Sequence, residues 1–196
     1  LPRRPSMPQP EHITRLEQPE LSKLDEDIQG YLKICEEKLG LMPNVLLALT
    51  IRPGKFRTFT KMYNEVMLAE SGLSKLEREM IAVVVSSANR CYYCLVAHGA
   101  AVRELSGDPQ LGEMLVMNYK VAELSQRQRA MLDFAWALTT DPRSGDEDAR
   151  AALRTAGFSD EEIFDICDVV GFFNYTNRLA HGVDMMPNPE YHLQAR

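Results

Sequence analysis

The sequence has few cysteines, a single tryptophan and no long apolar segment. Its longest run of apolar residues, Met80–Val85, holds six residues, whereas a helix needs about 20 to cross a bilayer. Two arginines stand near the N-terminus without an apolar stretch behind them, so the sequence shows no secretory signal. From these absences we expect a cytoplasmic protein without a membrane-spanning segment.

Basic residues are also in deficit, with 22 lysines and arginines against 28 aspartates and glutamates and a formal charge of −6. Nucleic-acid faces and basic membrane anchors require clustered positive charge, so we expect neither nucleic acid nor membrane as a partner. Four cysteines among 196 residues are too few for a secreted disulfide scaffold. A chain of this length buries roughly 70% of its unfolded surface and needs no metal simply to fold.

Strand signals are missing, whereas apolar residues recur at helical spacing through most of the chain. Between Gly54 and Met186 there are only two prolines and no Asn-Gly or Asp-Gly hairpin sequence. Three capping boxes, each a serine followed three residues later by Glu or Gln, mark helix starts at Ser74, Ser125 and Ser159. We therefore predict a compact all-α fold of about eight helices. The longer ones are expected at 24–39, 57–69, 75–88, 91–105, 126–139, 147–156 and 160–180, and a shorter one after Asp108-Pro109.

We expect three parts: a proline-rich N-terminal arm over 1–19, one all-helical domain over 20–186, and a C-terminal tail over 187–196. The arm holds five of the eleven prolines, and we interpret it as extended, either solvated or draped over a neighbouring subunit. The pattern Leu-Ser-x3-Arg-x-Met occurs at 73–80 and again at 124–131. Shared helix-start chemistry explains this echo more simply than a duplicated helical unit.

The densest chemical signal is Cys91-x-x-Cys94 followed by His98. If a helix begins there, the spacings of three and four residues put both sulfurs and the imidazole on one face. The first turn also lies at the positive end of the helix dipole, which favours thiolate over thiol. A free thiol with a pKa of about 8.5 is only about 3% ionised at neutral pH, and the dipole alone contributes about 0.3–1 kcal/mol. The histidine, and an acid that orients it, would have to supply the rest.

On the residues alone, several interpretations of this motif stay open. A zinc site would use Cys91, Cys94 and His98 with His181 or Glu79, but a second ligand pair at zinc spacing is missing. A thioredoxin motif needs a βαβ context, which an all-helical chain lacks. A dithiol peroxidase or disulfide reductase on a helical scaffold fits best. The structural alternative is a pair of buried cysteines beside a hydrogen-bonded histidine.

The motif has a longer pattern around it: Glu79, eleven intervening residues, and then C-x-x-C-x-x-x-H ending at His98. With this spacing the sequence resembles the alkylhydroperoxidase D family, within the wider carboxymuconolactone decarboxylase superfamily. The resemblance covers roughly residues 24–184. Four further segments are similar to the family's "peroxidase-related" branch, at 39–45, 52–54, 124–135 and 173–180.

The resemblance implies a thiol peroxidase with neither a metal nor an organic cofactor, built as a homo-oligomer. Cys94 would be the peroxidatic thiolate that attacks a hydroperoxide substrate, and Cys91 would resolve the resulting sulfenic acid as a disulfide. A dithiol electron donor, lipoyl- or thioredoxin-type, would then reduce this disulfide. Glu79 and His98 would act as a proton relay, often through water.

The sequence departs from the family pattern at Tyr93. The best-known members have a second relay histidine there, immediately before the second cysteine. A phenol with a pKa near 10 passes a hydrogen bond but is a poor base at neutral pH, so Tyr93 is a candidate site residue that changes the relay. Two other functions stay open: a cofactor-free lactone decarboxylase or isomerase of the same superfamily, and a redox-sensing helical protein that reacts only once.

Two further cysteines and three polar residues near the C-terminal end are expected to have structural roles. Cys35 and Cys167 fall on apolar helix faces and are expected to be inert buried thiols. Asn174, Asn177 and Arg178 stand at helical spacing, and we expect them to tie helices or subunits together by hydrogen bonds.

Overall fold

The computed structural model describes residues 9–196, and within that range it contains nine α-helices and no β-strand, which confirms the predicted all-α class. Residues 1–8 of the predicted arm lie outside the described range. The helices are α1 (Glu26–Leu39), α2 (Asn44–Leu49), α3 (Pro53–Tyr63), α4 (Lys75–Ala88), α5 (Tyr92–Ser106), α6 (Pro109–Asn118), α7 (Gln126–Thr140), α8 (Glu147–Thr155) and α9 (Asp160–Gly182). A π-helical turn, Asn64–Leu68, continues α3, and short 3₁₀ turns lie at Leu21–Lys23, Tyr119–Val121, Pro142–Ser144 and Pro189–His192.

Two helices near the N-terminal end differ from the prediction. Helix α2 was not predicted, because six residues are too few to show a helical period. Helix α3 begins at Pro53 rather than at residue 57. Proline is well suited to a first helical position, since its missing N–H would have no partner there.

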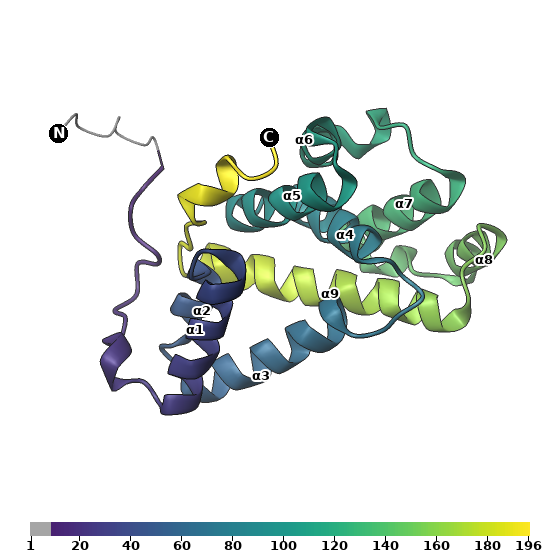
Figure 1. Ribbon diagram of the computed structural model, residues 1–196. Coiled ribbons are helices and arrows are strands. Elements are labelled where there is room, and N and C mark those ends of the chain that lie inside the picture. The colour runs from purple at the N-terminus through teal and green to yellow at the C-terminus, as the bar shows by residue number, and fades with distance from the viewer. Residues whose placement is uncertain (1–8) are drawn as a thin grey trace.

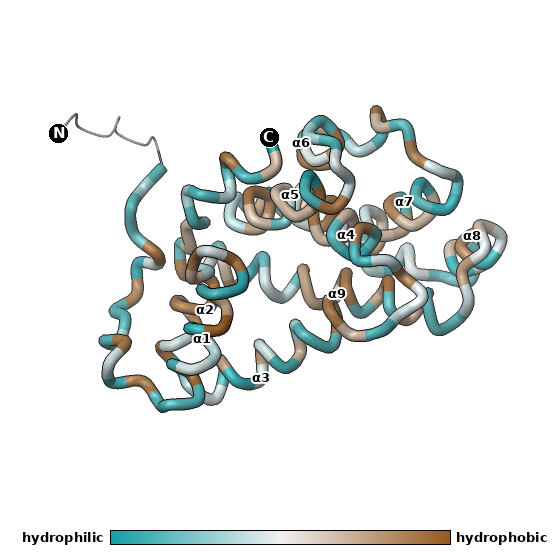
Figure 2. The backbone as a smooth tube through the Cα atoms, in the orientation of Figure 1, coloured by the Kyte–Doolittle hydropathy of each residue, from teal (hydrophilic) through white to brown (hydrophobic). Residues whose placement is uncertain are grey.

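Helix α4 lies at the centre of the fold, with α5, α6, α7 and α9 packed around it (Figure 1). Every residue from Arg78 to Ser86 is buried, so this helix is covered on all sides. The apolar run Met80–Val85, too short for a membrane, is therefore the middle of the core, and apolar colouring gathers along α4 and its neighbours in Figure 2. Side chains on α4 are fixed by packing, which makes it a rigid support for a site.

All three predicted capping boxes are present, at the starts of α4, α7 and α9. At two of these helix starts, the arginine of the repeated Leu-Ser-x3-Arg-x-Met pattern adds a hydrogen bond to the preceding segment. Arg78 Nη1 donates to the carbonyl of Ala69 (2.8 Å), and Arg129 Nη2 donates to that of Ala122 (2.7 Å). Each arginine thus reaches back from its new helix to the end of the preceding turn. The two copies of the pattern thus start their helices in the same way.

The described part of the arm pairs with the C-terminal segment of the same chain. The N–H of Arg15 donates to the carbonyl of Val183 (3.1 Å), and the N–H of Met186 donates to that of Ile13 (3.0 Å). Asp184 Oδ2 lies 2.9 Å from His12 Nε2 and 3.1 Å from Arg15 Nε. We call residues 9–16 together with 183–193 the arm–tail clasp; it crosses the end of the molecule where α5 begins.

Candidate active site

A tight turn between α4 and α5 sets the position of the cysteine pair. The N–H of Cys91 donates to the carbonyl of Ser86 (2.9 Å), and the N–H of Arg90 donates to that of Ser87 (3.1 Å), which are the two bonds of a Schellman ending. Arg90 takes the left-handed conformation that this ending requires, with φ of 54°, where glycine is usual. Cys91 is therefore the residue that precedes α5, and Cys94 lies in the first turn.

The two cysteine side chains are buried and hydrogen-bonded to each other, with Cys91 1% and Cys94 3% exposed. The hydrogen bond from the Cys94 thiol lowers the pKa of Cys91 to about 6, against the effect of burial; the Cys94 backbone N–H, His181 and His98 add to the lowering. The same bond, together with burial, raises the pKa of Cys94 well above its usual value. The two thiols therefore titrate as one pair, which loses its first proton more readily than an ordinary thiol does.

The bond to Cys91 and burial raise the pKa of Cys94, and hydrogen bonding to Asn177 of α9 and Ser86 of α4 acts in the opposite direction. Each of these two residues is 0% exposed. Asn177 Nδ2 donates to Ser86 Oγ (3.0 Å), and Asn177 Oδ1 accepts from Asn89 Nδ2 (2.9 Å). Asn177 thus joins α9 to α4, in keeping with the interhelical role predicted for it, and it also contacts the candidate nucleophile.

His98 and Glu79 form a second buried pair. Nδ1 of His98 lies 2.7 Å from Oε2 of Glu79, and the two side chains are 14% and 11% exposed. A carboxylate only accepts, so Nδ1 carries the proton and Nε2 is the nitrogen left to exchange one with another group. The ring of Phe173 stands at right angles to the imidazole, 4.7 Å away between centroids, and helps to hold its orientation.

Tyr93 is 4% exposed, and its hydroxyl oxygen accepts a hydrogen bond from the N–H of Val45 (3.0 Å). Burial raises the pKa of Tyr93 well above its usual value of 10. The phenol therefore stays protonated at neutral pH and cannot serve as a base. Its hydrogen bond ties the start of α2 to the first turn of α5.

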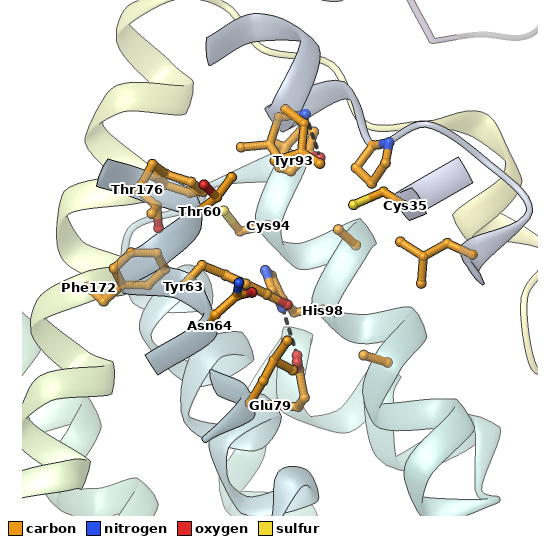
Figure 3. A pocket seen from close by; sticks show the side chains of 18 of the residues that line it. Cys35, Thr60, Tyr63, Asn64, Glu79, Tyr93, Cys94, His98, Phe172 and Thr176 are labelled. Carbon is orange, nitrogen blue, oxygen red and sulfur yellow. Dashed lines mark hydrogen bonds and ion pairs between the residues drawn. The ribbon is translucent and has the colours of Figure 1, made fainter. Parts of the chain in front are cut away.

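Cys94, Tyr93, His98 and Glu79 line one cavity of about 750 Å³ (Figure 3). The rest of its wall is mainly apolar and comes from α1, α2, α3, the π-helical turn, α5, α9 and the C-terminal segment after α9. Cys91 is not among the described residues that line the cavity, so a molecule inside it meets the sulfur of Cys94. Cys35, predicted to be a packing thiol, is half-buried on the wall, where burial raises its pKa and keeps it protonated.

The sequence indicated Glu79, Tyr93, Cys94 and His98, which the structure brings to one cavity, and it did not indicate Ser86. A serine directly after six apolar residues of a buried helix is the only available signal. For Asn177 the signal is its spacing from Phe173 and Ala180, which places an amide on the buried stripe of α9. Neither pattern shows that the polar group faces a cysteine on another helix.

Across residues 9–196, no three His, Cys, Asp or Glu side chains are arranged to hold a metal ion. His181, a possible fourth zinc ligand, donates from Nε2 to the carbonyl of Asn89 (3.1 Å), and Glu79 is bonded to His98. In the same range no helix combines the length and apolar character that crossing a membrane requires.

Comparison with known proteins agrees with the architecture and with the position of the motif. The model of the carboxymuconolactone decarboxylase family matches residues 53–116, a stretch that contains Glu79, both motif cysteines and His98. An uncharacterized peroxidase-related protein from Silicibacter sp. TM1040 is 59% identical, with a TM-score of 0.93 over 97% of this chain and 100% of that one. The chain belongs to the alkylhydroperoxidase D-like branch of the carboxymuconolactone decarboxylase family.

Two other solved structures are similar to this chain, at lower sequence identity. An alkylhydroperoxidase AhpD core protein from Ralstonia eutropha JMP134, also peroxidase-related and uncharacterized, is 41% identical, with a TM-score of 0.93 over 95% of this chain and 98% of that one. The debrominase Bmp8 with 2,3,4-tribromopyrrole shares the fold alone, at 18% identity and a TM-score of 0.77 over 93% and 94% of the two chains. A search of curated proteins gave no significant match.

Proposed function

We propose that this protein is a thiol-dependent hydroperoxide reductase that uses Cys94 as the peroxidatic residue and Cys91 as the resolving residue. The observation that carries the proposal is the shared cavity: Cys94 and the His98–Glu79 pair line it, while Cys91 stands behind Cys94, hydrogen-bonded to it. Nucleophile, proton donor and resolving thiol thus occur within two turns of one helix. Membership of a peroxidase-related branch supports the same activity.

The first step begins with a proton transfer inside the cysteine pair. The Cys94 thiol gives its proton to the Cys91 thiolate through their hydrogen bond, and the Cys94 sulfur attacks the terminal oxygen of the hydroperoxide. The O–O bond breaks, Cys94 becomes a sulfenic acid, and the alkoxide takes a proton from the imidazolium of His98 to leave as an alcohol. Glu79 accepts from Nδ1 and stabilises the positive charge that His98 carries before this transfer.

The second step forms the disulfide. The Cys91 sulfur attacks the sulfenic sulfur of Cys94, and the hydroxyl group leaves as water with the proton that Cys91 received. A dithiol donor, lipoyl- or thioredoxin-type, then reduces the disulfide by two successive exchanges and is itself oxidised. One peroxide thus consumes two electrons from one dithiol, and His98 recovers its proton from solvent.

Tyr93 has a supporting role in this proposal. Its oxygen is held by the N–H of Val45, so its O–H remains free to donate toward the cavity that it lines. It can thereby orient a bound peroxide oxygen, although it cannot replace a histidine base. Assembly into a homo-oligomer and residence in the cytoplasm stay predictions.

The function is tested by mixing reduced protein with one equivalent of cumene hydroperoxide and counting free thiols. The expected result is the loss of two thiols per chain, followed by continued peroxide consumption when dihydrolipoamide is added. Unchanged thiols would support the lactone decarboxylase or isomerase alternative. Loss of thiols without turnover, with dihydrolipoamide and with thioredoxin plus its reductase, would support the redox-sensing alternative.

A further inference from the structure

The C-terminal end of the chain forms part of the wall of the cavity. Residues 189–196, which we call the C-terminal strap, begin with the 3₁₀ turn Pro189–His192 and pack against α5 (Figure 1). Tyr191 and Gln194 of the strap line the same cavity as Cys94. A molecule in the cavity therefore meets the strap as well as the candidate nucleophile.

Arg103 of α5 holds the strap by its backbone. Nε of Arg103 donates to the carbonyl of Gln194 (3.1 Å), and Nη2 donates to the carbonyl of Tyr191 (2.7 Å). The arginine is 5% exposed, and a buried guanidinium needs hydrogen-bond partners for its donors. Because strap carbonyls supply these partners, displacement of the strap would leave a buried cation without them. This dependence keeps the strap in place.

Close packing of α5 against α6 fixes the stem of Arg103. A Cβ added to Gly112 of α6 would lie 3.0 Å from Arg103 Cγ and 3.0 Å from the carbonyl oxygen of Gly99, so a side chain at Gly112 would push the arginine aside. The absence of a side chain at Gly112 thus makes room for the arginine between the two helices. The guanidinium reaches the strap from a rigid base.

The strap also borders the mouth of the cavity. Gln194 Nε2 donates to Glu104 Oε2 (3.0 Å), and both residues line the cavity. Glu104 is exposed, so this bond lies where the cavity meets solvent. The other exposed residues of the lining come from α1 and the π-helical turn: Ile34, Lys38, Leu39, Glu65 and Leu68. The mouth is therefore framed by α1, the π-helical turn and the end of α5, with the strap along one side.

The size and polarity of the cavity indicate what the strap would meet there. A volume of about 750 Å³ suits a small organic molecule. Burial raises the pKa of Tyr191 to about 12, so its ring is neutral and adds to the mainly apolar wall. A compact apolar group fits beside this ring, whereas a long or bulky group has to displace it.

We propose that the C-terminal strap limits the size of the hydroperoxides that reach Cys94, with Tyr191 as the specificity-determining residue and Arg103 as the positioning residue that holds the strap. The inference rests on the proposed function, since it names the substrate class of that same site. The favoured substrates are organic hydroperoxides with a compact apolar group, such as tert-butyl hydroperoxide. Hydroperoxides with a long chain, such as that of linoleic acid, are disfavoured.

The test measures the access of two reagents of different size to Cys94 in a Cys91→Ser background, with mass spectrometry to locate the adduct. Iodoacetamide is small, and N-(1-pyrenyl)maleimide is bulky and apolar. Tyr191→Ala should raise the pyrenylmaleimide rate about tenfold and the iodoacetamide rate less than about twofold. The ratio of the two rates at one pH cancels any change in the thiolate fraction of Cys94.

Arg103→Lys should raise the same ratio, because a single ammonium group cannot replace the two separate donors of the guanidinium. The matched control is Leu193→Ala, which should leave the ratio unchanged. Leu193 belongs to the same strap but is 82% exposed, and it is not among the described residues that line the cavity. Steady-state assays should show the same selectivity, with a higher kcat/KM for linoleic acid hydroperoxide relative to tert-butyl hydroperoxide in Tyr191→Ala.

The outcomes separate this inference from the proposed function because alkylation needs no peroxide. An unchanged ratio in Tyr191→Ala, or an equal rise in Leu193→Ala, would overturn the inference even if peroxide is reduced. A raised ratio in a protein without peroxidase activity would uphold the size limit and refute the proposed function. Equal acceleration of both reagents in Arg103→Lys would refute the positioning role, and if this variant fails to fold, Tyr191→Ala decides alone.

Discussion

Nδ1 of His98 lies 2.7 Å from Oε2 of Glu79, a contact that joins α5 to the central helix α4 at the wall of the cavity. The two residues are nineteen positions apart, and the Schellman turn between their helices brings them together. Because the carboxylate holds Nδ1–H, the imidazole keeps one orientation and one tautomer, and it leaves Nε2 as its site of proton exchange. The pair is suited to general acid–base catalysis, which depends on a fixed orientation and a fixed tautomer of the imidazole.

Glu79→Gln should lower kcat/KM for cumene hydroperoxide by roughly 10- to 100-fold, since the amide can still accept from Nδ1 but carries no charge to stabilise the imidazolium. Glu65→Gln is the matched control. Glu65 lines the same cavity but is exposed, and its substitution should change the rate less than about twofold. Steady-state assays with dihydrolipoamide measure both variants. Equal rates for Glu79→Gln and the parent protein would remove the pair from the mechanism.

Replacing each motif cysteine should give different products. Cys94→Ser should reduce peroxide consumption to background, because the cavity then holds no sulfur of the pair. Cys91→Ser should still react once and stop as a sulfenic acid on Cys94, which dimedone traps and mass spectrometry locates. The reverse pattern, with dimedone on Cys91 in the Cys94→Ser variant, would exchange the two roles.

Alkylation of Cys91 should follow an unusually low pH midpoint. Iodoacetamide reacts with the thiolate, so the rate at Cys91 should titrate with a pKa of about 6. Cys94→Ala removes the hydrogen bond that contributes most to this low value, and the midpoint should rise toward that of an ordinary thiol. An unshifted midpoint in this variant would show that the bond between the sulfurs does not set the charge.

The same ionisation should stabilise the reduced protein as pH rises. Between about pH 6 and the usual thiol pKa of 9.0, native Cys91 binds fewer protons than unfolded Cys91. The free energy of unfolding therefore increases with pH in this interval, by up to about 1.4 kcal/mol per pH unit, and the gain is lost as pH falls through 6. Denaturant unfolding should show this slope, and a variant with both motif cysteines changed to serine should lack it.

Arg90→Gly should stabilise the fold by about 1 kcal/mol, or roughly 2–4 °C in Tm, because Arg90 holds a φ of 54° that is unfavourable for a residue with a side chain. Glycine loses more freedom on folding, which offsets part of this gain. Arg90→Ala keeps the penalty and should stay within about 0.5 kcal/mol of the parent. Thermal unfolding of the reduced proteins measures both, and a lower Tm for Arg90→Gly would show that the arginine side chain stabilises the turn.

Local sequence signals predicted the helices well, since capping boxes and helical periods are set by near neighbours. The C-x-x-C-x-x-x-H motif lies on one helix, so its shared face follows from the 3.6-residue period. Helix α2 escaped prediction because six residues show no period, and the left-handed Arg90 has no sequence signature of its own.

Contacts between side chains of different helices could not be predicted from the sequence. Ser86 and Asn177 meet only because α4 and α9 pack together, and the spacing within one helix carries no information about its neighbours. Which sulfur faces the cavity also depends on this packing, and so does the lowered pKa of Cys91, since its main cause is the hydrogen bond from the Cys94 thiol. The family spacing indicated the candidate site residues. Their exposure to the cavity and their pKa values depend on the tertiary structure.

Loosening the arm–tail clasp should expose Cys91. Cys91 belongs to a small apolar cluster that Ile13 of the arm and Met185 of the tail complete, and Asp184 holds the two segments together through His12 and Arg15. Asp184→Asn removes both ion pairs while keeping a residue that tolerates the φ of 50° found there.

Loss of the contacts of the Asp184 carboxylate with Arg15 and His12 amounts to about 1 kcal/mol, so opening of the clasp, and with it alkylation of Cys91 in a Cys94→Ser background, should become about fivefold faster. Asp27→Asn is the control, because it breaks an equally exposed pair with Arg57 between α1 and α3. Cys94 belongs to the same cluster, and Met185 and Tyr191 of the clasp line its cavity, so in a Cys91→Ser background its alkylation should also become faster with Asp184→Asn. A Cys91 rate that Asp184→Asn leaves unchanged would mean that reagents reach this sulfur without passing the clasp, and that the cavity serves both cysteines.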